Sequence, residues 1–278
     1  MLWPGLGEQF GEVVNPALVV GEVAALIQVI LLAVYRAGTD RFAPRLHAGL
    51  LWPVSLAGAT SIGCAVALNT WLATAHDAAN GNPGPGAMLS PAMWARTGHA
   101  LAAGVMVAGF AVASVHASGL RRGVHLIRNS MAFRTGMGMG SAAALVQAVA
   151  GWLSSVFDAG GSSQWAMVDA MFWLMAALGA AFVALGVLFW WGEWTGRSPA
   201  ASDTLLVGVS WLGAASVTAM VAGWLTSVLG RSPWLVDGVL LSADAVTRRG
   251  GTWLGAALLV GVLIVSTWIG TFVGRMKD

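Results

Sequence analysis

The sequence has few charged residues for its length. Asp, Glu, Lys and Arg make up only 9% of its 278 residues, whereas roughly 25% is usual for soluble domains. Hydrophobic residues make up 57%, and the mean hydropathy is +0.75. These values exclude a soluble globular chain and indicate an integral membrane protein. Because the few arginines lie at the ends of apolar segments and no basic run occurs, no nucleic-acid partner is expected.

Cysteine is nearly absent. The single cysteine, Cys64, lies in an apolar stretch, which excludes an intrachain disulfide framework and a cysteine-rich metal or iron–sulfur site within the chain. The N-terminal MLWPGLGEQFGEVVNP has no basic region before an apolar one, so a cleaved signal is not expected. We expect residues 1–16 to form an interfacial segment anchored by Trp3, and residues 17–278 to form a single membrane domain.

Seven apolar stretches are long enough to cross a membrane, since a crossing helix needs about 20 mainly apolar residues. Short connections rich in turn-forming residues separate them, such as NGNPGPG at 80–86. The sequence therefore predicts an all-α membrane protein, a bundle of seven transmembrane helices. The expected spans are 17–35, 47–74, 96–117, 135–157, 165–191, 204–229 and 252–273.

The fourteen basic residues predict the orientation of these spans. Ten of them follow the first, third and fifth spans or lie at the C-terminus: Arg36, Arg41, Arg45, Arg121, Arg122, Arg128, Arg134, Arg197, Arg275 and Lys277. The other four are Arg96, Arg231, Arg248 and Arg249. Because cytoplasmic loops carry the excess of Lys and Arg, we expect the C-terminus in the cytoplasm and the N-terminus outside. Several tryptophans near span ends, Trp71, Trp94, Trp165, Trp191 and Trp234, resemble an aromatic belt.

A few polar residues are left at bilayer depth, where such groups are costly and usually face the interior of a bundle. They are Glu22, Gln28, Asn69, His99, Gln147 and Asp169. His99 is the strongest candidate ligand, because small residues in RTGHALAAG would let a flat macrocycle approach its helix. The alternative is a histidine hydrogen-bonded to a neighbouring helix. The other histidines, His47, His76, His116 and His125, are expected in loops or at the surface.

A haem with two axial ligands needs a partner for His99 on another helix at the same depth. Met167, Met171 and Met175 lie on one face of the fifth span, towards its outer half. Such a stripe is commonly core packing, but histidine–methionine ligation is also an established way to hold an electron-transfer haem. Arg231, at the end of the sixth span, could pair with haem propionates; otherwise it is an ordinary interfacial arginine beside Trp234.

Several of these stretches together resemble subunit I of the cytochrome bd quinol oxidases. GRSPWLVDGVLLSADAV at 230–246 is similar to the family's GRxPW segment, and RTGHALAAG at 96–104 to its haem-ligating F-x-H-T-x-x-A-x-Y. LNTWLAT at 68–74 is similar to ANSWMQT, DRFAPRLH at 40–47 to DRLSPRLH, and MFWLMAALG at 171–179 to FRIMVGLG. The stretches occur in the family's order along nearly the whole chain.

The resemblance implies one low-spin haem b. His99 and Met175 would be its axial ligands, and Arg231, Trp234, Asn69 and Trp71 would lie near the cofactor. A quinone site beside it would be lined by Gln164, Trp165 and Asp169. The resemblance also implies a multi-pass protein of the bacterial inner membrane that works with other membrane or extracytoplasmic subunits.

The chain also departs from the family pattern. Family members have nine helices, and the first carries a histidine for the high-spin haem, which the first span here lacks. Val228 replaces a glutamate associated with that haem, Trp173 replaces an arginine, and the long quinol-binding loop is reduced to 158–164. These departures imply a chain that does not reduce oxygen alone.

We therefore expect an electron-transfer subunit of a respiratory complex that exchanges electrons between quinone and a partner's redox centre. Two alternatives stay open. One is a haem-free subunit that anchors such a complex, and the other is pairing with a related subunit that supplies the missing haems.

Overall fold

The computed structural model describes residues 4–39, 41–78, 88–156, 165–196 and 203–245. Within these ranges, six helical segments are long and apolar enough to cross a membrane. Five are α1 (Pro4–Ala37), α3 (Leu51–Ala78), α4 (Pro91–Arg121), α5 (Leu126–Val156) and α6 (Ala166–Trp194); the sixth combines α7 (Asp203–Ser210) with α8 (Leu212–Leu229). The predicted all-helical membrane fold is confirmed for this part of the chain. The expected seventh span, 252–273, lies outside the described residues.

The first helix begins earlier than expected. It runs from Pro4 instead of residue 17, and its backbone is kinked at Phe10, where φ is −128° and ψ is 18°. The kink separates a short stretch from the long apolar part of α1. An interfacial position for that stretch stays a prediction, and Trp3 lies outside the described residues. The second span is also divided, because α2 (Pro44–Gly49) precedes α3 with only Leu50 between them.

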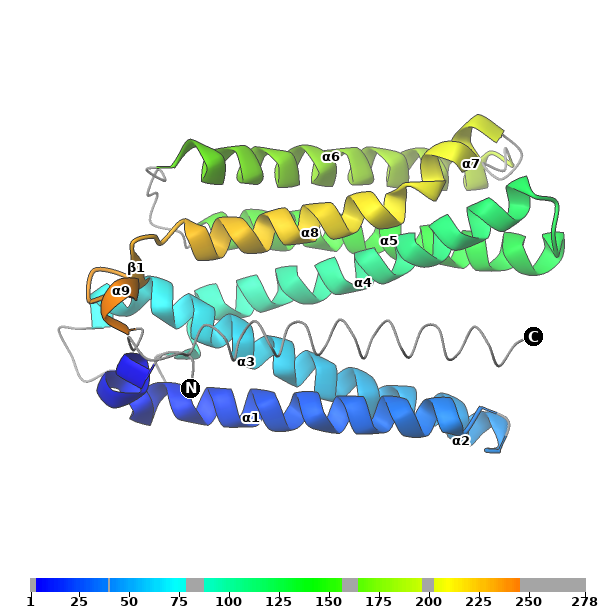
Figure 1. Cartoon of the computed structure of the whole chain (residues 1–278). Coiled ribbons are helices and arrows are strands. Elements are labelled where there is room, and N and C mark those ends of the chain that lie inside the picture. The colour runs from blue at the N-terminus through cyan, green and yellow to red at the C-terminus, as the bar shows by residue number, and fades with distance from the viewer. Residues whose placement is uncertain (1–3, 40, 79–87, 157–164, 197–202, 246–278) are drawn as a thin grey trace.

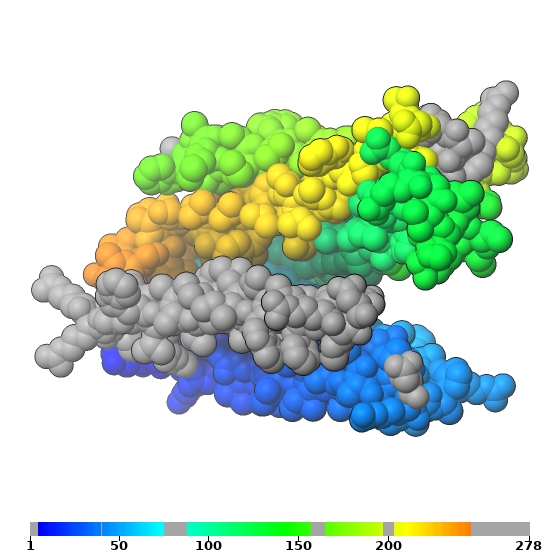
Figure 2. Space-filling model, turned by 45° about the vertical axis from the view of Figure 1, so that its right-hand side comes forward, coloured from blue at the N-terminus to red at the C-terminus, as the bar shows by residue number. Residues whose placement is uncertain are grey.

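Successive long helices run in alternating directions, so the molecule has two distinct ends (Figure 1). At one end α4 and α6 begin and α3, α5 and α8 finish; we call it the Arg231 end. At the opposite end, the Glu193 end, α6 finishes and α7 begins. In the space-filling view α1 and α6 lie on opposite sides of the molecule (Figure 2). This up-and-down order brings residues from the starts of α4 and α6 to one level.

Four helices form a square bundle. The neighbouring pairs α4–α5, α5–α6, α6–α8 and α8–α4 pack against each other, whereas the diagonal pairs α4–α6 and α5–α8 have few or no backbone contacts among the described residues. The α1–α3 pair packs beside this bundle, mainly through α3 and α4. A side chain on α4 that faces the bundle axis therefore points towards α6.

Aromatic side chains fill the middle of the bundle. Phe110 on α4 and Phe182 on α6 are both at most 1% exposed, and their ring centroids are 5.3 Å apart. Glycines let α4 and α5 approach closely: a Cβ on Gly136 would lie 2.7 Å from the backbone nitrogen of Ala113 and the carbonyl oxygen of Gly109. Small residues at such a contact are the usual means of close packing between membrane helices.

The sixth span is not one continuous helix, as the sequence predicted, but is broken at Trp211 between α7 and α8. Ser114 of α4 binds the backbone at this break. Its hydroxyl lies 2.9 Å from the carbonyl oxygen of Val209 and 2.7 Å from that of Phe110, and it accepts a hydrogen bond of 2.8 Å from the amide of Gly213. The hydroxyl thus supplies a partner for backbone groups that the interrupted helix leaves unpaired, which would be costly in a membrane.

A small cap that the all-α prediction missed follows α8. Strands β1 (Trp234–Val236) and β2 (Leu240–Leu241) form an antiparallel hairpin, and the four-residue helix α9 (Ser242–Ala245) follows it. The cap is fixed to α3 because the amide of Asp237 donates to the carbonyl oxygen of Leu72 over 2.9 Å. The strands are too short to be recognised from periodicity in an apolar sequence.

Candidate functional site

His99 lies on α4, close to the Arg231 end. Ser90 caps the start of this helix, where its hydroxyl accepts a hydrogen bond from the amide of Met93, and Pro91 follows in the first turn. At about 1.5 Å of rise per residue, His99 is about 12 Å along α4 from Pro91. Its side chain is partly buried against α5. The capped start fixes the depth of the imidazole in the bundle.

The imidazole of His99 has a defined tautomer. Its Nδ1 lies 3.0 Å from the carbonyl oxygen of Gln147 on α5. Because a carbonyl oxygen only accepts hydrogen bonds, Nδ1 must carry a proton, and in the neutral ring Nε2 then has the lone pair. A backbone carbonyl that holds the other ring nitrogen is the usual arrangement for a metal-binding histidine.

A glycine provides the space for this ring. A Cβ added to Gly151 would lie 2.9 Å from Nδ1 and 3.0 Å from Cε1 of His99, which is closer than normal contact. Gly151 is one helical turn after Gln147, so the ring lies directly on the backbone of α5. Any larger residue at position 151 would displace the ring.

Met175 lies on α6, diagonally across the bundle from α4. It is about 14 Å along its helix from Ala166 at the same rise per residue, which matches the depth of His99. Its Sδ packs against α8, where a Cβ added to Gly223 would lie 2.5 Å away. Of the other two predicted methionines, Met167 is 57% exposed and Met171 is partly buried.

The two candidate ligands are therefore on opposite sides of the bundle axis at one level. Each lies in a notch that a glycine leaves on a neighbouring helix, Gly151 for His99 and Gly223 for Met175. Deeper in the bundle, Phe110 and Phe182 close the axis. Between these rings and the Arg231 end, the buried residues of α8 next to the site are the small side chains of Ala219 and Ala222.

Arg231 lies just after α8 and bridges to α3. Its Nη1 donates a hydrogen bond of 2.7 Å to the carbonyl oxygen of Asn69, and the side-chain amide of Asn69 donates one of 2.9 Å to the hydroxyl of Ser227. Its Nε is buried and has no hydrogen-bond partner among the described residues. A buried donor of this kind is costly unless another group accepts its hydrogen bond.

The electrostatic surroundings of Arg231 are unfavourable to its charge. Burial is the main cause that lowers the pKa of its guanidinium from the usual value, and the nearby cation Arg96 lowers this pKa further, while Asp237 acts in the opposite direction. Two arginines from different segments thus produce a positive region at this end of the bundle. Such a region favours an anionic group.

Trp71 of α3 belongs to a core that α1, α3 and the cap form together, separate from the core around Phe110 and Phe182. Trp71 is 2% exposed and packs edge-on against Phe10 of α1 at a centroid distance of 5.4 Å, so its predicted place in an aromatic belt is wrong. Its Nε1 and the hydroxyl of Thr70 are buried without partners among the described residues. Trp234 begins β1 and is partly buried. The two candidate ligands therefore lie in the bundle, whereas Asn69 and Trp71 lie on α3 and Arg231 and Trp234 follow α8.

Other predicted polar residues are placed as follows. Trp165 and Asp169, which were predicted to line a quinone site, are both exposed at the start of α6, and Gln164 lies outside the described residues. His47 and His116 are more enclosed than expected. His47 stacks on Tyr35 at 4.0 Å, and Nδ1 of His116 lies 2.7 Å from Oδ1 of Asn129.

Sequence reasoning missed the residues that position the two candidate ligands. Gln147 was selected for its side chain, but its backbone carbonyl makes the contact, and Gly151, Gly223 and Arg96 were not selected at all. The spacing of Gln147 and Gly151, four residues apart on one helix, was the available signal. Their relation to His99 depends on how α4 and α5 pack, which a single sequence does not state.

The donor set fits a low-spin haem. Among the described residues, no group of three or more His, Cys, Asp and Glu side chains could hold a metal ion alone. A porphyrin supplies four nitrogen ligands itself, so the protein needs to contribute only two axial groups, and an imidazole with a thioether is an established pair. The unpaired Nε of Arg231 is suited to a propionate.

Comparison with known proteins agrees with this architecture. The sequence matches the model of a family described as cytochrome bd terminal oxidase subunit I, over residues 1–159 and 157–277. The two matching blocks meet in the connection between α5 and α6, where the family's long loop was expected to be reduced. A comparison with curated proteins finds no match.

The fold is also similar to that of a solved structure, "The structure of bd oxidase from Geobacillus thermodenitrificans". The TM-score is 0.79 at 19% sequence identity, and the alignment covers 98% of this chain and 79% of that chain. At this identity the likeness shows the fold alone, whereas the family model covers almost the entire sequence. The chain is therefore a multi-pass membrane protein that belongs to the cytochrome bd terminal oxidase subunit I family.

Proposed function

We propose that the chain is a haem b electron-transfer subunit of a respiratory oxidoreductase complex. One observation carries the proposal: the carbonyl of Gln147 fixes His99 as the Nδ1–H tautomer, and Met175 lies at the same depth on the diagonal helix. This arrangement leaves Nε2 of His99 available as a ligand. The resemblance of both residues to the family's ligand motifs supports the same assignment.

The proposed roles follow from the contacts of each residue. His99 and Met175 would ligate the haem iron, and Arg231 would donate hydrogen bonds to a propionate at the Arg231 end. A haem b with both axial positions filled supplies one-electron transfer and has no open position for oxygen. Gln147 positions the imidazole, while Phe110 and Phe182 exclude water from the deeper part of the bundle.

The proposal places the chain in the bacterial inner membrane with the Arg231 end outside, as the distribution of basic residues predicts. Electrons would pass between a quinone and a redox centre of a partner subunit. Trp165 and Asp169, exposed at the same end as His99, are the described candidates for contact with quinone.

A reduced-minus-oxidised absorbance spectrum of the purified chain tests this function. We expect the sharp α band of low-spin haem b, lost in His99→Ala and shifted or broadened in Met175→Leu, because each change removes one axial ligand. His125→Ala is the control, since His125 is exposed in the turn between α4 and α5. An α band that survives in His99→Ala would overturn the ligand assignment, and its absence from the unmodified chain would leave the anchoring role.

A further inference from the structure

A carboxyl group lies near the middle of the first membrane span. Glu22 is about 18 Å along α1 from the kink at Phe10 and about 22 Å from Ala37 at the end of the helix, at about 1.5 Å of rise per residue. Both lengths exceed half the thickness of the hydrocarbon core, which is about 30 Å in total. A lipid headgroup at either surface is therefore too far away to pair with Glu22.

The side chain of Glu22 points away from the rest of the described chain. Polar residues at this depth usually face the interior of a bundle, but Glu22 is exposed, and so are Val19, Leu26 and Val29, which share its side of α1. We call these four residues the Glu22 face. Glu22 makes no hydrogen bond or ion pair within the part of the chain that the structure describes.

A different face of α1 packs against α3. A Cβ added to Gly21 would lie 3.0 Å from the Cβ of Cys64, and a Cβ added to Gly58 would lie 2.5 Å from Nε2 of Gln28. These close contacts fix the rotation of α1 about its own axis. The Glu22 face is consequently held on the outside of the described bundle, on a helix that lies on the opposite side of the molecule from α6 (Figure 2).

Asn15 adds a second polar group beside this face. It is exposed on α1 seven residues before Glu22, and residues seven apart lie on one side of a helix, two turns from each other. Asparagine side chains within membrane spans commonly hydrogen-bond to a neighbouring helix. The two exposed polar groups therefore both indicate that another helix packs on this side of α1.

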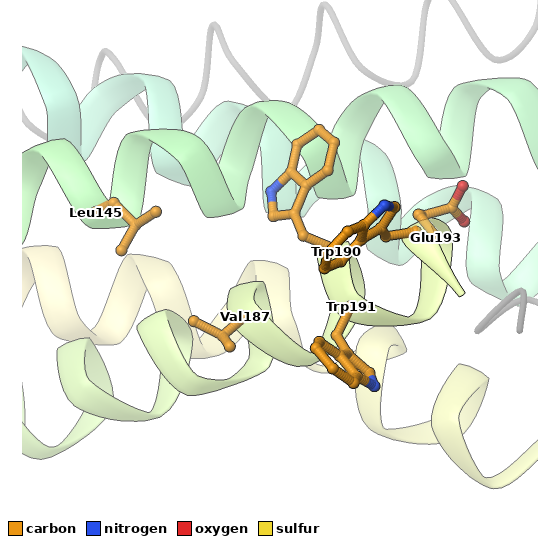
Figure 3. Close-up of a pocket in the computed structure, with 6 residues that line it drawn as sticks. Leu145, Val187, Trp190, Trp191 and Glu193 are labelled. Atoms are coloured by element: carbon orange, nitrogen blue, oxygen red, sulfur yellow. The ribbon is translucent and has the colours of Figure 1, made fainter. Parts of the chain in front are cut away.

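The apolar groove on α5 and α6 provides a contrast. Leu145, Val187 and three tryptophans line it, and the carboxylate of Glu193 at its edge is paired with Arg134 (Figure 3). Acyl chains can cover such a surface, because its hydrocarbon and indole groups require no polar partner. On the Glu22 face they would leave a carboxyl group unpaired in hydrocarbon, which is costly.

The occupant of the Glu22 face must bring a cation to the middle of the bilayer. The expected seventh span of this chain, 252–273, contains no Lys or Arg, and a second copy of α1 would bring another carboxylate. We propose that the Glu22 face binds a transmembrane helix of a different subunit, which carries a lysine or arginine near the middle of its span and pairs with Glu22. The inference goes beyond the haem site and does not depend on haem binding.

Binding of synthetic transmembrane helices to the full purified chain in lipid nanodiscs, measured by resonance energy transfer, tests the pairing. One peptide is a polyleucine helix with a single central lysine, and the other has leucine at that position. We expect the lysine helix to bind about tenfold more tightly, the size expected from one polar contact between membrane helices, and we expect Glu22→Leu to abolish this preference. Asp203→Asn, which removes a carboxylate at the end of a span, should retain it. Equal binding of the two peptides, or a preference that persists in Glu22→Leu, would overturn the proposal.

Photo-crosslinking in native membranes tests the location. A photoreactive residue at position 26, one turn from Glu22, is compared with one at Val187 of α6, which is similarly exposed. From position 26 alone we expect a crosslink to a segment of another subunit that contains Lys or Arg at bilayer depth, and we expect Glu22→Leu to abolish it. Crosslinks to lipid alone, to a second copy of this chain or to a helix without a cation would contradict the proposal, as would the same crosslink from position 187. Neither experiment alters His99, so their failure would leave the haem proposal standing.

Discussion

Substitution of Gly151 by alanine is a direct test of how His99 is held. The new Cβ would lie 2.9 Å from Nδ1 and 3.0 Å from Cε1 of the imidazole. To reach an ordinary contact the ring must move away from α5 by about 0.5 Å, which stretches its hydrogen bond to Gln147 beyond the usual range of about 2.7–3.2 Å. The hydrogen bond that fixes the tautomer is thereby weakened or lost.

Two opposing effects set the size of the change. Alanine in place of glycine within a helix stabilises by about 1 kcal/mol, whereas a partly buried donor left unpaired costs about 1–3 kcal/mol. Gly104→Ala provides the reference for the first effect alone, because a Cβ at position 104 meets no atom within 4 Å. We expect Gly151→Ala to be about 1–3 kcal/mol less stable than Gly104→Ala.

Thermal or denaturant unfolding in mild detergent, followed by circular dichroism, measures this difference. The haem content of each purified variant provides a second measurement, and we expect it to fall in Gly151→Ala but not in Gly104→Ala. If the two variants are equally stable and retain equal amounts of haem, the ring does not lie against α5 as described, and the proposed positioning of His99 is wrong.

Three further substitutions test other contacts. Ser114→Ala should destabilise the chain by about 1–3 kcal/mol because it leaves the amide of Gly213 unpaired at the helix break; Ser118→Ala, which loses only a bond within its own helix, should change stability little in the same unfolding assay. Gly136→Val should lower the free energy of unfolding by about 1–3 kcal/mol or more, because the valine forces α4 and α5 apart. An unchanged melting temperature would contradict the close packing. Arg231→Met should leave the haem-free chain within about 1 kcal/mol of its original stability, because it removes a buried, incompletely paired cation. The same substitution should weaken haem retention. A loss of stability without any effect on haem binding would show that Arg231 is purely structural.

The helices were predictable because long apolar runs bounded by arginines, prolines and glycines allow few alternatives in a membrane. Their limits were less predictable. Pro4 starts α1 well before the hydrophobic run, and the break at Trp211 has no local signal, since the group that binds it, Ser114, is on a different helix.

The candidate ligands could be proposed from motifs and depth, but their supporting contacts could not. His99 and Met175 are residues of recognisable chemistry, whereas the notches at Gly151 and Gly223 depend on the rotation and spacing of neighbouring helices. Trp71 shows the same limit, because its surroundings also depend on how distant segments pack. Its position near a span end suggested an interfacial tryptophan, and only the packing of the cap and α1 places it in a core.

The haem content of the purified chain, determined as the pyridine haemochrome, tests the central claim most directly. The account predicts one haem b per chain in the unmodified protein and almost none in His99→Ala. A chain that is folded and stable in detergent but contains no haem b, even when it is produced with ample haem and its partner subunits, would contradict it.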